Sequence, residues 1–407
     1  MAQRSNRSSK KGFPRARLLT DANEDTLLAC GVDPASLPYL APKLIHRNLL
    51  IKRVKLFAAN ILKQSMLSIG GDVAVNRNVI SGNTEFSDCL LMGDLRHFSL
   101  LLAKLSLQKG LEAIAQTIQE QIFPPLGPLC RDFCSHSHTW RDLPVIMGIL
   151  NVTPDSFSDG GLWLDPSKAI DHGIQMEQDG ADLIDVGGES SRPGAQEVGG
   201  VQEISRVIPI IESLATRVSI PISIDTTKAE VARAAIDAGA TVINDISALS
   251  KDPDMMKIAR STGAGVVLMH MRGSPETMQE NTSYGDIIDE IITYLDLRIE
   301  ACLDAGIRST SLIVDPGMGF AKTHDGNLCI LHHIAEFRSL GVPVLLGHSR
   351  KSTIGSILDC AADDREEGTD AVSAWAAIQG VDFLRVHDVK RAFRIRKIIS
   401  SIRAEKP

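Results

Sequence analysis

Long apolar runs are missing from this sequence. No stretch of its 407 residues approaches the roughly 18 consecutive apolar residues of a membrane-spanning helix, so we expect no membrane segment. Cysteine is sparse as well. The seven cysteines are an odd number scattered along the chain, which favours a reducing compartment over a disulfide framework. We therefore interpret the protein as cytoplasmic.

An excess of basic charge is also lacking. The net charge of −7 argues against general nucleic-acid binding, and the 43% hydrophobic content is typical of a globular chain with a large core. Residues 1–17 are the exception, because they are basic with no acid among them. We predict a disordered tail there. It has no apolar core like that of a secretory signal, although its Arg- and Ser-rich composition leaves an organelle transit peptide open.

Eight short apolar segments follow from Pro144 onward, and each is followed by a stretch of helical character. They are residues 145–151, 181–188, 222–226, 242–247, 265–271, 311–317, 342–349 and 382–388. Nearly continuous Val, Ile and Leu in such segments indicates parallel strands covered on both faces. Eight units in residues 144–407 match the length of a (β/α)8 TIM barrel, which is about 250 residues. A doubly wound open sheet is the alternative.

Polar or ionisable side chains stand at or just past the end of every predicted strand. They are Asn151, Glu189, Asp225, Asn244 with Asp245, His270, Asp315, His348, and Arg385 with His387. In a barrel these ends converge on one face, which is where the active sites of this fold lie. Residues 151–161 then form the first loop over that site, and we expect the loop to cover a ligand.

Two loops have the composition of anion sites. Residues 347–355 place Arg350 and Lys351 with two serines before a helix, and the loops after strands 7 and 8 often bind phosphate in this fold. Residues 187–195 add Ser191 and Arg192 in a glycine- and proline-bounded loop. The sequence therefore predicts a phosphorylated substrate.

The region before the barrel carries no recognisable chemical motif. We predict a small α/β or α+β domain over residues 18–128, with helices over 50–71 and 96–122 on either side of a turn-prone stretch, 75–86. A linker is expected at 129–143. It contains Cys130, Cys134, His136 and His138, whose spacing matches no common zinc pattern, so metal binding there stays open.

Seven ordered segments of residues 144–407 resemble the dihydropteroate synthase family of pterin-binding TIM barrels. They read NVTPDSFSDGG, IDVGGESSRPGA, ISIDTTKAEVARAAIDAGATVINDIS, MHMRGSPETMQ, DPGMGFAKT, GHSRKSTIG and RVHDV. The resemblance implies a transferase of folate biosynthesis. It would join 6-hydroxymethyl-7,8-dihydropterin pyrophosphate to p-aminobenzoate, giving 7,8-dihydropteroate and pyrophosphate. It also implies a target of sulfonamides and a homodimer whose partners are small molecules, with neither nucleic acid nor membrane involved.

The resemblance also assigns roles to individual residues. Pterin recognition falls to Asp225, Asn244, Met269, Asp315 and Lys351, with Arg385 stacked on the ring; the pyrophosphate end falls to Asn151, Ser191, Arg192 and His387; the p-aminobenzoate side falls to Phe157, Pro193 and Ser352. Mg²⁺ is the implied cofactor, held by Asn151 and diphosphate oxygens. Asp225, Lys351, Arg385 and His387 are the implied catalytic residues, with Asp225 stabilising a pterin cation after pyrophosphate departs.

Two other functions remain as alternatives. A pterin-dependent methyltransferase domain shares the barrel but has no pyrophosphate to hold, and a catalytically silent barrel would bind a pterin or a partner protein. Four positions depart from the family pattern, namely Ser191, which keeps the hydroxyl of the usual threonine, Thr227, Ala321 and His348. Among them, His348 is expected to add a titratable group beside the anion site.

Overall fold

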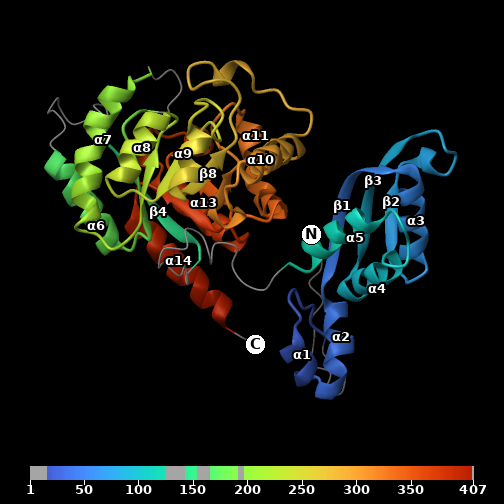
Figure 1. Ribbon diagram of the computed structural model, residues 1–407. Helices are drawn as coiled ribbons and strands as arrows, with labels where there is room; N and C mark the ends of the chain where they lie inside the picture. The colour runs from blue at the N-terminus through green and yellow to red at the C-terminus, as the bar shows by residue number, and fades with distance from the viewer. Residues whose placement is uncertain (1–15, 125–142, 154–165, 191–196, 406–407) are drawn as a thin grey trace, which may run out of the picture. The chain divides into compact units, whose positions relative to one another are not determined.

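The computed structural model describes residues 16–124, 143–153, 166–190 and 197–405. The chain divides into two compact units that meet in sequence near residue 126, and each is described by itself (Figure 1). No helix in these ranges is both long and apolar enough to cross a membrane.

The C-terminal unit is built on eight parallel strands. They are β4 (Val145–Asn151), β5 (Leu183–Gly187), β6 (Ile222–Asp225), β7 (Val242–Asp245), β8 (Gly265–Met269), β9 (Leu312–Asp315), β10 (Leu345–Gly347) and β11 (Phe383–Val386). Neighbouring strands pair in the order β10-β11-β4-β5-β6-β7-β8-β9, and a parallel bridge between Val314 and Val344 links the two ends. Each predicted segment contains one strand, so the predicted (β/α)8 barrel is confirmed.

Helices surround these strands (Figure 1). They are α6 (Pro166–Asp179), α7 (Gly200–Ala215), α8 (Ala229–Asp237), α9 (Met255–Thr262), α10 (Ile287–Asp304), α11 (His324–His332), α12 (Ser352–Leu358), α13 (Glu366–Ile378) and α14 (Val389–Ala404). Local sequence sets their ends. The Asp286 side chain accepts a hydrogen bond from the Asp289 backbone N–H at the start of α10, and Gly263 ends α9 with a φ of +68°.

The interior of the barrel has an apolar layer with a polar layer above it. Val145, Met147, Leu183, Val242, Val267, Ile313, Leu345 and Phe383 form one buried cluster. Because side chains of a strand alternate between faces, the residue two positions further along also points inward. Those positions hold Asp185, Asn244, Met269, Asp315, Gly347 and Arg385, with Asp225 two positions after the buried Ser223. The chemistry-bearing side chains therefore sit directly on an apolar floor.

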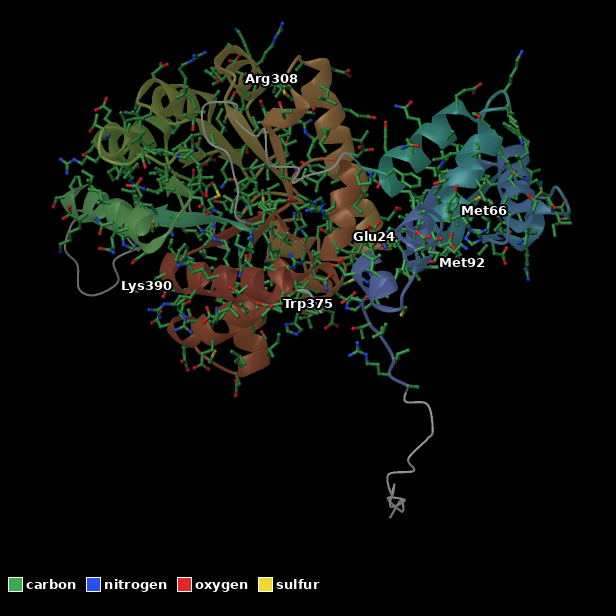
Figure 2. All side chains as sticks on the ribbon, turned by 90° about the horizontal axis from the view of Figure 1, so that it is seen from below. Glu24, Met66, Met92, Arg308, Trp375 and Lys390 are labelled. Atoms are coloured by element: carbon green, nitrogen blue, oxygen red, sulfur yellow. The ribbon has the colours of Figure 1, made fainter. Side chains whose placement is uncertain are left out.

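The N-terminal unit is an α+β fold. Its elements are α1 (Glu24–Ala29), α2 (Leu37–Leu44), β1 (His46–Lys55), α3 (Leu56–Leu67), β2 (Asp72–Val75), β3 (Phe86–Asp94), α4 (Leu95–Leu105) and α5 (Glu112–Ile122). The strands form an antiparallel sheet in the order β1-β3-β2, and α3, α4 and α5 contribute to one core with it. Met66 of α3 is fully buried in that core, and Figure 2 labels it together with Met92 of β3.

Two helix predictions for this unit are correct only in part, since α3 (Leu56–Leu67) lies within the predicted range 50–71. The helix predicted over 50–71 is a strand up to Lys55, because Leu50 and its neighbours pair with β3. Pairing partners distant in sequence outweigh local periodicity there. The helix predicted over 96–122 is two helices, and Gly110 with a φ of +84° lies between them. β3 itself was not anticipated.

Candidate active site

Arg385 joins two carboxylates across the polar layer of the barrel. Its Nε donates to Oδ2 of Asp185 at 2.6 Å and its Nη2 donates to Oδ2 of Asp225 at 2.7 Å. Nδ2 of Asn244 donates to the same Oδ2 of Asp185 at 2.9 Å. Residues from β5, β6, β7 and β11 thus form one hydrogen-bonded network, which includes three of the residues predicted for pterin recognition.

Asp185 was missed by the sequence analysis. It stands in the middle of an apolar segment, not at its end, and was counted as part of the strand. Its side chain is fully buried, and Oδ1 has no hydrogen-bond partner among the described residues. One signal could have revealed it, because it is two residues after an inward-facing leucine and therefore shares the inward face of the strand.

Asp315 and Lys351 line the same layer from β9 and from the start of α12. Oδ1 of Asp315 accepts from the Gly317 backbone N–H at 2.7 Å. Nζ of Lys351 lies 4.2 Å from the centroid of the Phe320 ring, within the range of a cation–π contact. Phe320 belongs to a small buried cluster with Met269 and Met278, which supplies an apolar wall beside the carboxylates.

Burial dominates the electrostatics of these carboxylates. It raises the pKa of Asp225 to about 7; Arg385 lowers that pKa, whereas Asp185, Glu203 and Asp245 raise it further. The pKa of Asp315 is likewise raised by burial, against the Gly317 N–H and Lys351. For Arg385, burial favours a lower pKa, but Asp185 and Asp225 outweigh burial and the pKa is raised. The layer therefore holds a permanent cation beside two carboxyl groups, Asp225 and Asp315, whose pKa values are raised.

The end of β4 and the loop after β11 bring two further predicted residues, Asn151 and His387, to this face. His387 makes two contacts with Oγ of Ser349. Its backbone N–H donates to this oxygen at 3.2 Å, and its Nδ1 lies 2.9 Å from the same atom. A side chain on Gly187 would place its Cβ 3.7 Å from Oδ1 of Asn151 and 3.8 Å from Oδ2 of Asp225. Glycine there leaves the space between these two oxygens open.

A buried lysine, Lys322, supports the loop after β9. Nζ of Lys322 contacts Nδ1 of His270 at 2.9 Å and donates to the backbone oxygens of His270 at 3.2 Å and Phe320 at 2.8 Å. Burial lowers the pKa of Lys322 to about 7 and that of His270 to about 3. His270 is therefore a neutral acceptor that ties the end of β8 to the loop before α11.

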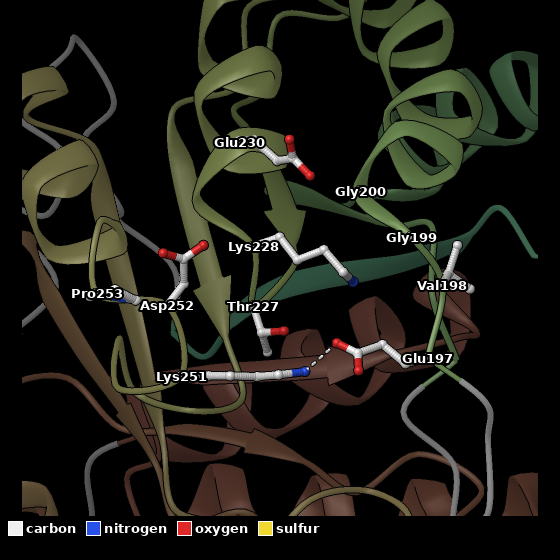
Figure 3. A pocket seen from close by; sticks show the side chains of 10 residues that line it. All are labelled: Glu197, Val198, Gly199, Gly200, Thr227, Lys228, Glu230, Lys251, Asp252 and Pro253. Carbon is white, nitrogen blue, oxygen red and sulfur yellow. Dashed lines mark hydrogen bonds and ion pairs between the residues drawn. The ribbon is translucent and has the colours of Figure 1, made fainter.

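Beside the network, the loops after β5, β6 and β7 enclose a polar hollow of about 680 Å³ (Figure 3). Lys228 and Lys251 line it with Glu197, Glu230 and Asp252. Lys228 pairs with Glu189 and with Glu203, while Lys251 pairs with Glu197 at 2.7 Å. The hollow contains none of the residues predicted for pterin recognition, and its two cations are already paired with carboxylates.

Several predicted residues cannot be placed. Phe157, Ser191, Arg192 and Pro193 lie outside the described residues, as do Cys130, Cys134, His136 and His138. Ser352 is the first residue of α12 and is exposed.

Three of the four departures from the family pattern lie in the described part of the chain. His348 is fully buried, its Nε2 lies 2.7 Å from Oγ of Ser373, and burial lowers its pKa to about 4, so the expectation of a titrating group beside the anion site is wrong. Ala321 has a φ of +54°, a conformation that favours glycine, and its buried methyl group packs in the cluster of Met269 and Phe320. Thr227 lines the hollow of Figure 3.

Fold and site together define a (β/α)8-barrel enzyme whose mouth gathers carboxylates and an amide around the cations Arg385 and Lys351. The family described as pterin binding enzyme matches residues 147–387, more than half of the chain. The chain belongs to this family.

Relatives extend the comparison. A dihydropteroate synthase of Synechocystis is 44% identical over 282 residues, which cover 69% of this chain and 96% of that protein. A crystal structure of Yersinia pestis dihydropteroate synthase with a sulfonamide drug is 42% identical, has a TM-score of 0.62, and covers 65% of this chain and 95% of that one.

One relative reaches further toward the N-terminus. A probable bifunctional folylpolyglutamate synthase/dihydropteroate synthase of Haloferax volcanii is 38% identical over 384 residues. The match covers 92% of this chain and 45% of that protein, so this chain spans less than half of its length. A match of that extent includes a large part of the N-terminal unit, which is therefore shared by the two proteins.

Proposed function

We propose that this chain is a dihydropteroate synthase. It transfers the pterinylmethyl group of 6-hydroxymethyl-7,8-dihydropterin pyrophosphate to the amino group of p-aminobenzoate. The observation that carries the proposal is the network in which Arg385 bridges Asp185 and Asp225 beside Asn244, with Asp315 and Lys351 in the same layer. Family membership and the relatives named dihydropteroate synthase support it.

The polar layer suits the edge of a pterin. Its carboxylates and amide accept and donate hydrogen bonds in a buried setting, where such bonds discriminate strongly between ligands. Met269 and Phe320 supply an apolar wall for a flat ring. Arg385 is partly buried and permanently charged, and we propose that it faces the ring while staying bonded to two carboxylates.

The pyrophosphate end lies toward Asn151 and His387. Mg²⁺ suits this end, because it takes few protein ligands and shares its coordination with substrate phosphates. The described residues contain no cluster of three or more His, Cys, Asp or Glu able to hold a metal, and Oδ1 of Asn151 faces the open space at Gly187. Asn151 with diphosphate oxygens would hold the ion. When bound, it neutralises charge on the leaving group. Ser191 and Arg192 are proposed to contact the same oxygens.

The chemistry exchanges one bond for another at the exocyclic methylene. The bond from this carbon to the pyrophosphate oxygen breaks, and the electron pair leaves with the pyrophosphate toward Arg385 and His387. Asp225 stabilises the positive charge that develops on the pterin. The p-aminobenzoate nitrogen then forms the new bond to carbon and loses one proton. Ser352 at the start of α12, with Phe157 and Pro193, is proposed to bind the aryl amine.

We also propose a homodimer formed through α13 and α14. Trp375 and Ile378 of α13 are 41% and 52% exposed, and Ile398 and Ile402 of α14 are 60% and 65% exposed. Nη2 of Arg403 donates to the Ile378 carbonyl, so the two helices are tied together at this end. An apolar strip of this kind is typical of an interface. A cytoplasmic location is in keeping with the free thiols of Cys30, Cys89, Cys302, Cys329 and Cys360.

The direct test is to incubate the chain with dihydropterin pyrophosphate, Mg²⁺ and p-aminobenzoate and to measure dihydropteroate and released pyrophosphate in equal amounts. A sulfonamide should raise the KM for p-aminobenzoate and leave the maximal rate unchanged. Release of pyrophosphate without dihydropteroate, or transfer of a methyl group from a methylated pterin instead, would contradict the proposal. Omission of Mg²⁺ with added chelator tests the cofactor separately.

A further inference from the structure

We propose that Asp185 is a positioning residue for the pterin site, one that fixes both the amide orientation of Asn244 and the direction of the Arg385 guanidinium. The inference rests on the proposed function. It begins with a single atom, since Oδ2 of Asp185 receives both Nε of Arg385 at 2.6 Å and Nδ2 of Asn244 at 2.9 Å.

The orientation of the Asn244 amide follows from that shared atom. A carboxylate oxygen that already accepts from a guanidinium can only accept from a second partner. Asn244 must therefore turn its NH₂ group toward Asp185, and its carbonyl oxygen must point away from Asp185. With Asn244 only 5% exposed, no bulk water competes to reverse this choice. Asp185 thereby determines that Asn244 presents its carbonyl oxygen and one remaining N–H to a ligand.

The second consequence concerns Asp225. Arg385 uses Nε for Asp185 and Nη2 for Asp225, so the guanidinium is shared and does not grip either carboxylate with both nitrogens. A guanidinium without Asp185 would be free to form the two parallel bonds it prefers with a single carboxylate. It would then occupy both oxygens of Asp225. By holding Nε, Asp185 excludes the side-on pair through Nε and Nη2 that would occupy both oxygens of Asp225.

Stability does not account for Asp185. Its side chain is fully buried, and Oδ1 has no hydrogen-bond partner in the described part of the chain, which is an unfavourable state for a buried polar atom. Buried ion pairs often contribute no net stability compared with apolar side chains of similar volume. We therefore attribute the buried Asp185 to its effect on the orientation of Asn244 and Arg385.

The chain offers a matched control. Asp382, just before β11, is also fully buried, pairs with Arg338 at 2.8 Å and has an Oδ1 without a partner in the described residues. Its Oδ2 accepts from the Val344 backbone N–H at 3.0 Å, and it lies at the opposite end of β11 from Arg385. It reproduces the burial and the ion pair of Asp185 without the contact to the site.

The experiment compares Asp185→Ala, Asp185→Asn and Asp382→Ala in the full chain, with folding checked by circular dichroism. We expect Asp185→Ala to raise the KM for the pterin substrate about 10-fold or more, with the KM for p-aminobenzoate changed by less than about 2-fold. Asp185→Asn, which keeps an acceptor oxygen, should recover part of the loss. Asp382→Ala should lower the unfolding temperature and leave both KM values unchanged.

A double-mutant cycle identifies the route of the effect. In an Asn244→Ala background, Asp185→Ala should raise the pterin KM by a smaller factor than it does in the wild-type chain. Equal factors in both backgrounds, or equal changes in the two KM values, would overturn the proposal. If Asp185→Ala does not fold, Asp185→Asn must still act on the pterin KM alone.

Failure of the proposed function is recognised separately. If the wild-type chain forms no dihydropteroate, the same variants are compared by calorimetric binding of 6-hydroxymethyl-7,8-dihydropterin. Weaker binding by Asp185→Ala but not by Asp382→Ala would support the positioning role without any turnover. Identical affinities would refute it.

Discussion

Nζ of Lys228 lies 2.7 Å from Oε2 of Glu203, and Glu203 is fully buried. Lys228→Met therefore leaves a carboxylate in the interior without its cation, and Glu189 loses the same partner. Breaking a buried pair from one side costs about 3 to 5 kcal/mol. We expect a loss of that order in the free energy of unfolding, measured by urea denaturation. Lys251→Met is the control, since Lys251 and Glu197 are about half exposed and such a pair contributes at most about 1 kcal/mol. Equal losses of unfolding free energy in the two variants would show that the Lys228–Glu203 pair is no more important for stability than the exposed pair.

Asp225→Asn should abolish most activity while the fold is kept. The substitution preserves shape and removes the charge that stabilises the pterin cation, and removal of one such electrostatic contact costs about 100-fold or more in kcat. Asp252→Asn is a suitable control, because Asp252 lines the hollow of Figure 3 outside the network. Turnover by Asp225→Asn near the wild-type rate would remove Asp225 from the mechanism.

Pterin binding should weaken at acid pH. Burial raises the pKa of Asp225 to about 7, so the carboxylate form that accepts hydrogen bonds grows as pH rises through this value and is lost below it. The affinity for 6-hydroxymethyl-7,8-dihydropterin, measured by calorimetry between pH 5.5 and 8.5, is expected to rise with pH and then level off. This ligand carries no phosphate, so its own titration does not interfere. Constant affinity over the range would contradict a raised pKa in the free protein.

Two adjacent cations should behave differently. Lys351 faces Phe320 in the polar layer, whereas Arg350 turns to Glu366. Lys351→Ala is expected to raise the pterin KM about 10-fold, the scale of one charge-assisted contact. Arg350→Ala should change it by less than about 3-fold, because its ion pair is partly exposed and contributes little. Steady-state kinetics at saturating p-aminobenzoate measures the pterin KM of both variants. A larger rise for Arg350→Ala than for Lys351→Ala would assign the pterin contact to Arg350.

The dimer proposal is tested at α14. Ile398→Glu together with Ile402→Glu places two charges in the exposed apolar strip and should halve the mass measured by light scattering after gel filtration. Leu107→Glu, at an 86% exposed leucine of the N-terminal unit, is the matched control and should leave the mass unchanged. A monomeric wild-type chain would refute the proposal directly.

The barrel could be predicted from the sequence because parallel strands covered on both faces read as short, apolar segments, and all eight were recognised. Asp225, Asn244, Asp315 and Arg385 were identified because they stand at strand ends. Asp185 was missed because its position depends on which face of the strand is inward, and pairing with Arg385 spans 200 residues. In the N-terminal unit, residues 50–55 of β1 were predicted as helix because their pairing with β3 cannot be recognised from the local sequence. The burial of His348 against Ser373 was equally invisible in sequence.

The apolar layer beneath Arg385 closes the barrel below the polar layer. This apolar layer is formed by Val145, Leu183, Phe383 and their neighbours. Reactants and products must therefore enter and leave at the end of the barrel where the strands end. Whatever rests deepest must arrive first and depart last. For the proposed reaction, we expect the bicyclic ring to bind before the aryl amine and the joined product to leave only after the space above it is empty.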